Sequence, residues 1–214
     1  MTRLRPAAFL DKDGTLIDDV PYNVDPAHVR LTRGARDGAW SLRAAGYALV
    51  VVTNQSGVAR GLFGAHDLLG VQARVEDLLG LELDGFYWCP HLPAGVVAEY
   101  AIVCACRKPA PGLLTRAAAE LGLDLARSWM IGDIASDIEA GRRAGCRTAL
   151  LAASPPPALR PAPTLVAADL AEAARRIVGD AARSDHDEHP APPPERPRCS
   201  LAAHARRSLK TCPP

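Results

Sequence analysis

The stretch Ala8-Phe9-Leu10-Asp11-Lys12-Asp13-Gly14-Thr15 decides the fold. Its apolar start is typical of a buried strand in a parallel sheet, and it ends abruptly in two aspartates separated by one residue. On an extended backbone, Asp11 and Asp13 point to the same face, about 7 Å apart. Two carboxylates held so close repel each other unless a cation lies between them or one carries a proton. The pattern therefore predicts a metal-assisted nucleophile with an acid/base partner at a strand end.

Apolar runs and amphipathic segments alternate along the chain. We expect strands at 7–11, 48–53, 85–88, 129–132 and 148–152, an edge strand at 164–166, and helices at 34–45, 65–79, 112–121, 135–144 and 167–178. This alternation predicts an α/β fold in which helices cover both faces of a parallel sheet. The pattern stops near Gly179. We therefore expect one domain over residues 1–179 and a disordered tail, rich in Pro and Arg, over residues 180–214.

Composition limits the classes of function. The 214 residues carry a net charge of +1 and only 5% are aromatic, which argues against a nucleic-acid binder or a membrane-surface binder. Apolar runs stay shorter than the roughly 18 residues that cross a bilayer, and the first six residues do not resemble a signal peptide. We expect a cytoplasmic monomer that acts on a small molecule.

Two further segments place polar groups after or between apolar elements. Residues 50–57 form an apolar run that delivers the hydroxyl of Thr53, and the turn that follows offers backbone amides to an anion. Arg107-Lys108-Pro109 supplies two adjacent cations. Lysine is rare in this arginine-rich chain, so Lys12 and Lys108 stand out because both lie within or beside these motifs.

A last acidic motif follows the strand expected at 129–132. Gly132 and Asp133 end the strand, and Asp137 follows on the starting helix. Alone, the two aspartates are best interpreted as partners of the helix dipole. Together with the two aspartates at the first strand end, they make a cluster of oxygen ligands suited to Mg²⁺.

In order and spacing, these segments resemble the four motifs of the haloacid dehalogenase (HAD) superfamily of phosphohydrolases. The resemblance extends over residues 7–178 and implies a HAD-like Rossmannoid sheet. It implies that Asp11 attacks phosphorus and becomes an aspartyl-phosphate, while Asp13 protonates the leaving alkoxide and then deprotonates water. It also implies that Thr53 and Lys108 stabilise charge on the transferring phosphoryl group.

The same resemblance implies a Mg²⁺ cofactor. Its ligands would be Asp11, the backbone carbonyl of Asp13, and Asp133. Asp137 is expected to support these ligands through hydrogen bonds.

Four soft donors indicate a second metal. Cys89 and His91 lie close together, as do Cys104 and Cys106, and the loop 89–106 joins the two pairs. Such a set suits tetrahedral Zn²⁺ of a structural type. Disulfides are the alternative, although a bridge between Cys104 and Cys106 would be strained and a cytosolic protein disfavours bridges. The zinc loop ends directly at the two adjacent cations, so we expect zinc to fix them in place.

The zinc loop also narrows the resemblance. Cys-Pro-His followed by Cys-x-Cys-Arg-Lys-Pro, the segment 53–61 and the segment 19–22 resemble the heptose bisphosphate phosphatases and the related histidinol-phosphate phosphatases, which lack a large cap domain. This implies a Mg²⁺-dependent phosphomonoesterase that removes the 7-phosphate of D-glycero-D-manno-heptose 1,7-bisphosphate. One position departs from the pattern, because Ile134 stands where the subgroup commonly has lysine.

Candidate substrate contacts follow from the same comparison and from charge. A bisphosphate needs a second anion site, for which the bidentate fork of Arg107 is the first candidate and Arg60 the second. The full set of expected substrate-binding residues is Asp19, Tyr22, Asn54, Gln55, Ser56, Arg60 and Arg107. Alternative functions are a histidinol-phosphate phosphatase, a phosphatase of nucleic-acid ends, or an inactive HAD scaffold that binds a partner.

Overall fold

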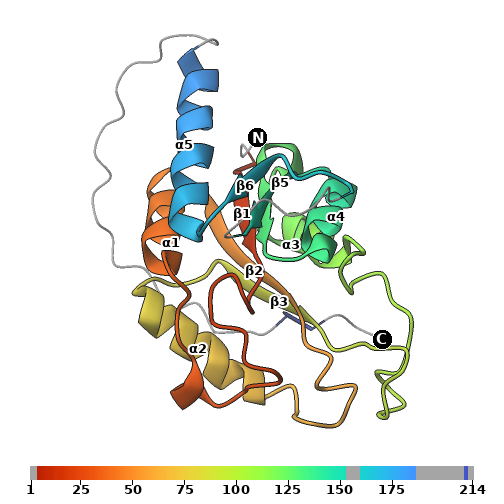
Figure 1. The fold of residues 1–214 in the computed structure, drawn as a ribbon. Coiled ribbons are helices and arrows are strands. Elements are labelled where there is room, and N and C mark those ends of the chain that lie inside the picture. Colours follow the sequence, from red (N-terminus) through yellow and green to blue (C-terminus); the bar gives the residue numbers. More distant parts are fainter. Residues whose placement is uncertain (1–3, 153–159, 187–209, 212–214) are drawn as a thin grey trace.

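A seven-stranded parallel sheet forms the centre of the computed structural model, which describes residues 4–152, 160–186 and 210–211. The strand order is β6-β5-β4-β1-β2-β3-β7 (Figure 1). The strands are β1 (Ala7–Leu10), β2 (Ala48–Asn54), β3 (Gly85–Cys89), β4 (Trp129–Gly132), β5 (Arg147–Leu151), β6 (Leu165–Ala167) and β7 (Lys210–Thr211). All pairs of neighbouring strands are parallel, which confirms the predicted fold class.

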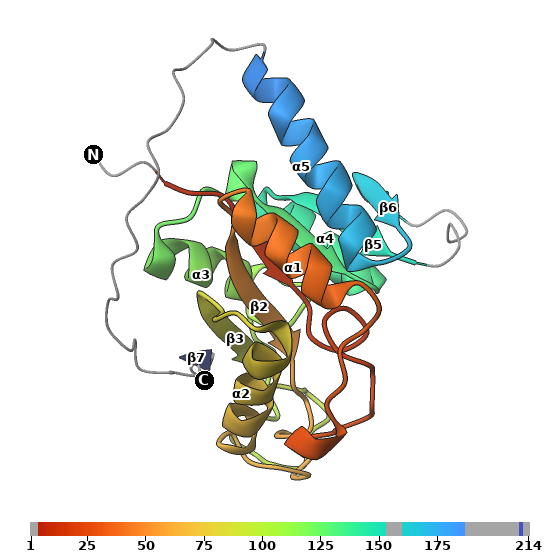
Figure 2. The same cartoon turned by 90° about the vertical axis from the view of Figure 1, so that its left-hand side faces the viewer.

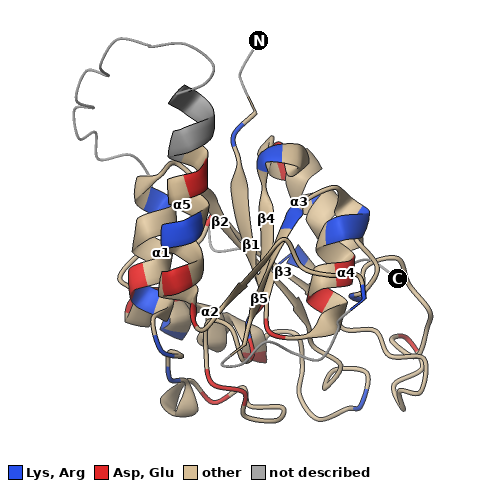
Figure 3. Cartoon of the chain, turned by 45° about the horizontal axis from the view of Figure 1, so that its top comes forward, with Lys and Arg blue, Asp and Glu red and all other residues tan. Residues whose placement is uncertain are grey.

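Helices cover both faces of the sheet (Figure 3). One face is covered by α1 (Ala35–Ala44), α2 (Asp67–Leu79) and α5 (Leu170–His186), and the other by α3 (Gly112–Leu121) and α4 (Ala135–Ala144). Figures 1 and 2 both show α1 beside α5, the helix pair with the most extensive contact. Two short 3₁₀ turns, η1 (Pro26–His28) and η2 (Leu125–Arg127), lie in the connections.

The apolar run of β1 supplies both cores. Ala8 and Leu10 pack with α1, α2 and α5, whereas Ala7 and Phe9 pack with α3 and α4. All four side chains are fully buried. Because side chains alternate between the faces of a strand, only a continuous apolar run can fill both layers. Each large side chain buried in this way contributes about 1.5–3 kcal/mol.

The strand order brings the predicted motifs to one edge of the sheet. β1 lies between β4 and β2, with Phe9 in register with Met130 on one side and Val50 on the other. Immediately after β1, the amide of Asp11 donates to the carbonyl of Ile131 at 3.0 Å. The carboxyl ends of β1, β2 and β4 therefore meet at the position where open α/β sheets bind ligands.

No separate cap domain interrupts the described part of the chain. The connection from β1 to α1 contains only η1, and the connections from β2 to α2 and from β3 to α3 contain turns and bends. These connections extend beyond the carboxyl ends of the strands and cover the site with short loops. Among the described helices, none has the length and apolar character needed to cross a membrane.

The last elements differ from the expected boundaries. Residue 167 belongs to β6, and α5 starts later, where the carboxylate of Asp169 accepts a hydrogen bond from the amide of Glu172 as an N-cap does. The helix then continues beyond Gly179 to His186. Lys210 and Thr211 pair with β3 instead of belonging to the expected tail. The rest of the expected tail, residues 187–209 and 212–214, lies outside the described residues.

Candidate active site and metal centres

A buried lysine joins two of the predicted carboxylates. The Nζ atom of Lys108 lies 2.6 Å from Asp11 Oδ1 and 2.6 Å from Asp137 Oδ1, and it also donates to the carbonyl of Val52 at 3.0 Å. All three charged side chains are almost completely buried. Lys108 thus connects the segment after β3 with the ends of β1 and β2 and the start of α4. This network fixes the Asp11 carboxylate in one orientation.

Asp133 completes the acidic cluster, because Gly14 makes room for it. Gly14 has a φ of +75°, and a Cβ atom built on it would lie 2.2 Å from Asp133 Oδ2. The hydroxyl of Thr15 donates to Asp133 Oδ1 at 3.4 Å. One carboxylate oxygen each from Asp11, Asp133 and Asp137 lies within 4.8 Å of the others. Three converging carboxylates of this kind are typical ligands of Mg²⁺, so the donor set fits the ion.

The cluster shifts the protonation of its members. Burial raises the pKa of Asp11 from 3.8 to about 6, although the Lys108 ammonium opposes the shift. Burial also raises the pKa of Asp133, with the charge of Asp11 as the next cause. For Lys108, burial lowers the pKa, but the carboxylates of Asp11 and Asp137 outweigh it and hold the pKa above its usual value. The site therefore has an excess of negative charge that a divalent cation would relieve.

Asp13 is held from two sides. Its Oδ1 atom lies 2.6 Å from Lys12 Nζ, and its Oδ2 atom accepts a hydrogen bond of 3.1 Å from Gln55 Nε2. Gln55 Nε2 also donates to the hydroxyl oxygen of Thr53 at 2.9 Å. One amide thus aligns Asp13 and Thr53 with each other, and it leaves the hydroxyl hydrogen of Thr53 available to a ligand.

Asn54 is engaged with the backbone of Lys108. Its side-chain amide donates to the Lys108 carbonyl at 3.1 Å, and its side-chain oxygen accepts from the Lys108 amide at 3.0 Å. This paired contact fixes the loop that carries the central lysine. Asn54 therefore positions the Lys108 backbone, and it also lines the pocket beside Asp13.

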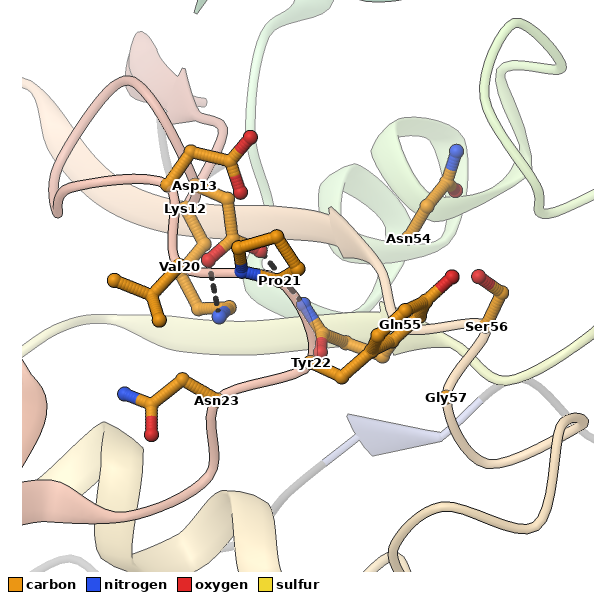
Figure 4. A pocket seen from close by; sticks show the side chains of 11 residues that line it. Lys12, Asp13, Val20, Pro21, Tyr22, Asn23, Asn54, Gln55, Ser56 and Gly57 are labelled. Carbon is orange, nitrogen blue, oxygen red and sulfur yellow. Dashed lines mark hydrogen bonds and ion pairs between the residues drawn. The ribbon is translucent and has the colours of Figure 1, made fainter.

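A pocket of about 270 Å³ opens beside Asp13 (Figure 4). Three segments line it: the end of β1, the loop that follows it, and the turn after β2. The lining residues are Lys12, Asp13, Asp19, Val20, Pro21, Tyr22, Asn23, Asn54, Gln55, Ser56 and Gly57. The volume lies near the lower end of the range for small-molecule sites. Five of the seven expected substrate-binding residues thus line one pocket.

The two expected arginines lie outside this lining. The guanidinium of Arg60 lies over the ring of Tyr22, 5.9 Å from the ring centroid, so it contacts a residue that lines the pocket. Arg107 is half-buried, and its Nη1 atom donates to the carbonyl of His91 at 3.2 Å. Ile134, which follows Asp133, is 51% exposed.

The four soft donors form a compact cage. The three Sγ–Sγ distances among Cys89, Cys104 and Cys106 are 3.3–3.6 Å. His91 Nδ1 lies 3.6 Å from the sulfur of Cys89 and 3.4 Å from the sulfur of Cys106. These distances exceed the about 2.05 Å of a disulfide, and they approach the roughly 3.8 Å between sulfurs in a tetrahedral Zn²⁺ site. The donor set fits zinc, whereas the disulfide alternative does not fit these distances.

The cage also favours thiolate. A hydrogen bond from Cys106 lowers the pKa of Cys89 to about 6, although burial opposes this shift. Cys146, which lies outside the cage, shows the opposite behaviour, since burial raises its pKa to about 12. Thiolate is the form that binds a metal. The contrast separates the cage from an ordinary buried cysteine.

Sequence reasoning assigned no role to Lys12 or Asn23, although both line the pocket. Lys12 lines the pocket and contacts Asp13, and its only signal was the scarcity of lysine in the chain. Tyr22 was expected to contact substrate, but its left-handed backbone, with a φ of 57°, had no sequence signal. Asn23 lies in the same loop and also lines the pocket without having been expected there.

Comparison with known proteins identifies the family. A model of HAD-hydrolase-like proteins matches residues 105–173. The D-glycero-beta-D-manno-heptose-1,7-bisphosphate 7-phosphatase of Yersinia pestis is 43% identical over 154 residues, which cover 71% of this chain and 82% of that protein. The protein of the same name from Escherichia coli (strain K12) is 41% identical and covers 71% of this chain and 81% of its own length.

A solved structure agrees with these relatives. D,D-heptose 1,7-bisphosphate phosphatase from B. bronchiseptica, complexed with magnesium and phosphate, superposes with a TM-score of 0.68 at 29% identity. The superposition covers 83% of this chain and 99% of that one. This chain belongs to the HAD-like phosphatases, in the family of the D-glycero-beta-D-manno-heptose-1,7-bisphosphate 7-phosphatases.

Proposed function

We propose that this protein is a Mg²⁺-dependent phosphatase that removes the 7-phosphate of D-glycero-D-manno-heptose 1,7-bisphosphate through an aspartyl-phosphate on Asp11. The observation that carries the proposal is the convergence of Asp11, Lys108, Asp133 and Asp137 from separate segments at one sheet edge. The names of the relatives support the choice of substrate.

Magnesium would be held by carboxylates of the acidic cluster. We assign Asp11, the backbone carbonyl of Asp13, and Asp133 as its ligands, and Asp137 as the residue that orients Lys108 beside them. When bound, the ion neutralises charge on the phosphoryl oxygens and lets an anionic carboxylate approach an anionic ester.

The side chains divide the chemistry among them. One Asp11 oxygen is held by Lys108, and the carboxylate attacks phosphorus while the bond from phosphorus to the ester oxygen breaks. Asp13 gives its proton to the departing alkoxide. It then takes a proton from the water that attacks the aspartyl-phosphate, which releases phosphate and restores both carboxyl groups. The Lys108 ammonium and the Thr53 hydroxyl donate to phosphoryl oxygens as charge develops.

The rest of the substrate would occupy the pocket beside Asp13. Asp19, Tyr22 and Ser56 offer polar groups to sugar hydroxyls along its wall. We assign the distal phosphate to Arg107, whose guanidinium is anchored at one nitrogen and keeps other N–H groups for a bidentate contact. Arg60, stacked near Tyr22, is the second cation on that side.

Zinc is proposed as a structural cofactor. The cage precedes Arg107 directly, and Arg107 contacts the carbonyl of the zinc donor His91. Zinc would therefore hold the two cations of the loop in place, with no position left open for a water molecule. The net charge of +1 supports a small-molecule substrate over nucleic acid or membrane lipid, and we propose a cytoplasmic monomer.

A substrate panel tests this function. We expect Mg²⁺-dependent phosphate release to have the highest kcat/KM on heptose 1,7-bisphosphate, compared with fructose 1,6-bisphosphate and histidinol phosphate. Asp11→Asn serves as the control and should abolish turnover, because a neutral amide cannot attack phosphorus. A preference for histidinol phosphate would replace the substrate assignment. Full activity of Asp11→Asn would contradict the aspartyl-phosphate.

A further inference from the structure

Lys12 is a buried cation that the proposed chemistry does not use. Its side chain is 2% exposed, and its Nζ atom lies 2.6 Å from Asp13 Oδ1. Figure 4 shows the Asp13 carboxylate between this ammonium and the amide of Gln55. Among the residues that line the pocket, Lys12 is the one with a positive charge.

The ammonium of Lys12 has more N–H donors than the one acceptor that the described residues give it. An ammonium carries three N–H groups, and in the described part of the chain its hydrogen-bonding partner is Asp13 alone. Leaving charged donors unsatisfied in a buried site is costly, so acceptors should come from whatever fills the pocket. Lys12 shares the positioning of Asp13 with Gln55, which contacts the other carboxylate oxygen.

We propose that Lys12 sets substrate specificity by donating to an oxygen on the carbon next to the ester carbon. The inference rests on the proposed role of Asp13 as the acid that protonates the ester oxygen. The Asp13 carboxyl group then donates its proton to the ester oxygen, while its Oδ1 atom lies 2.6 Å from the Lys12 ammonium. An oxygen on the adjacent carbon would lie close to the ester oxygen, and because Lys12 and Asp13 line the same pocket it would come within hydrogen-bonding reach of Nζ.

The substrate class follows from this geometry. Polyol and sugar phosphates carry a hydroxyl next to the phosphorylated carbon, as the proposed heptose does beside its 7-phosphate. Simple alkyl phosphates lack it, so they leave the buried ammonium without its acceptor. A site built around a hydrogen bond discriminates most strongly against ligands that lack the partner group.

Two isomeric substrates isolate this contact. 2-Hydroxypropyl phosphate has its hydroxyl on the carbon next to the ester carbon, whereas 3-hydroxypropyl phosphate has the same atoms with the hydroxyl one carbon further. We expect the wild-type enzyme to prefer the first isomer by at least about tenfold in kcat/KM. In Lys12→Met, this preference should fall below about threefold, because methionine keeps an unbranched side chain but lacks the ammonium that donates to the hydroxyl.

Gln55→Met is the matched control. It disturbs Asp13 from the opposite side but keeps the ammonium, so it should lower kcat/KM for both isomers by the same factor and preserve the preference. Lys12→Gln repeats the test with a polar side chain if Lys12→Met does not give a folded protein by circular dichroism.

Two results would overturn the inference. One is a wild-type enzyme without a preference between the isomers, and the other is a Lys12 variant that loses activity on both isomers equally. Failure of the heptose assignment is a separate result, seen when the wild-type enzyme leaves heptose 1,7-bisphosphate intact but still discriminates between the isomers.

Discussion

Gly14 is the residue on which the acidic cluster depends most directly. Its left-handed backbone turns the chain after Asp13, and its missing side chain lets Asp133 lie against it. A Cβ atom at this position would overlap the Asp133 carboxylate at 2.2 Å. The glycine thus makes the turn and leaves room for the Asp133 carboxylate, the proposed Mg²⁺ ligand.

We therefore expect Gly14→Ala to displace Asp133 and to weaken Mg²⁺ binding by about 10–100-fold, with a matching loss of activity at limiting Mg²⁺. The measurement is phosphate release as a function of Mg²⁺ concentration. Gly46→Ala is the control, because Gly46 has a φ of +86° but no atom within 4 Å of its built Cβ. It shares the backbone strain without the clash and should keep wild-type Mg²⁺ dependence. Equal behaviour of the two variants would contradict this account.

The raised pKa of Asp11 predicts a competition between protons and Mg²⁺. Burial raises this pKa from 3.8 to about 6, so without metal the folded protein holds the proton more tightly than the unfolded chain does. This group's contribution to stability is therefore present at low pH and is lost as pH rises through about 6. Mg²⁺ binds the deprotonated form, so its affinity should fall about tenfold per pH unit below that pKa.

Thermal unfolding with and without Mg²⁺ measures this competition. We expect Mg²⁺ to raise Tm clearly at about pH 7.5 and only slightly at about pH 5. In Asp11→Asn, which cannot titrate at this position, the small remaining effect of Mg²⁺ should depend much less on pH. An equal rise in wild-type Tm at both pH values would be evidence against proton competition at Asp11.

At the residue scale, the sequence indicated which carboxylates meet, and it named one of the two lysines that accompany them. The opening stretch indicated that Asp11 and Asp13 need a compensating charge, and the structure gives each its own lysine. Lys108 was expected near the phosphoryl group. Lys12 stood out in the sequence but was given no role in the site, and strict alternation on an extended strand would direct it away from its neighbours. The strand ends at Leu10, and the flexible lysine stem turns back to Asp13.

At the scale of elements, the connection from β3 to α3 does the most to shape the site. It carries Cys104 and Cys106 of the Cys/His cage, the proposed zinc site, and continues directly into Arg107 and Lys108. The amide of Gly112 donates to the carbonyl of Ala105 at 2.9 Å, which closes the loop against the start of α3. Val96 and Val103 of this connection are 80% and 86% exposed, so they add little apolar packing that could order it.

We expect Cys104→Ser to lower zinc from about one ion per chain to a small fraction, and to reduce kcat/KM by at least about tenfold, because Lys108 loses its fixed position. Metal analysis and phosphate release on the same preparation measure both effects. Cys146→Ala is the control, since Cys146 is buried outside the cage and should keep full zinc content. Loss of zinc with unchanged activity would remove the proposed link between cage and catalysis.

Elements with strong apolar runs were predicted within a few residues of their observed ends. The run that contains Val50 and the run that contains Met130 both became central strands beside β1. The end of α5 was missed, because Gly179 suggested a stop that the helix passes through. A single glycine costs a helix only about 1 kcal/mol, which the extensive packing of α5 against α1 offsets.

At the scale of the whole molecule, the residues proposed for the site all precede residue 138, whereas the chain continues far beyond it. The later part adds β5, β6 and α5 to one side of the sheet and β7 to the other. At that second edge, Lys210 lies 3.4 Å from Glu120, and Arg116 donates to the carbonyl of Thr211. Both contacts involve partly exposed groups at the margin of the sheet, away from Asp11.

Deleting residues 187–214 should therefore cost stability but not catalysis. The exposed ion pair contributes at most about 1 kcal/mol, and the short strand pairing adds about 1 kcal/mol. For a domain of this size, we expect Tm to fall by roughly 2–8 °C. kcat/KM should stay within about twofold of the full chain, because the carboxylates and Lys108 keep their contacts. A tenfold loss of kcat/KM, with the zinc content unchanged, would instead place part of the substrate site in the deleted segment.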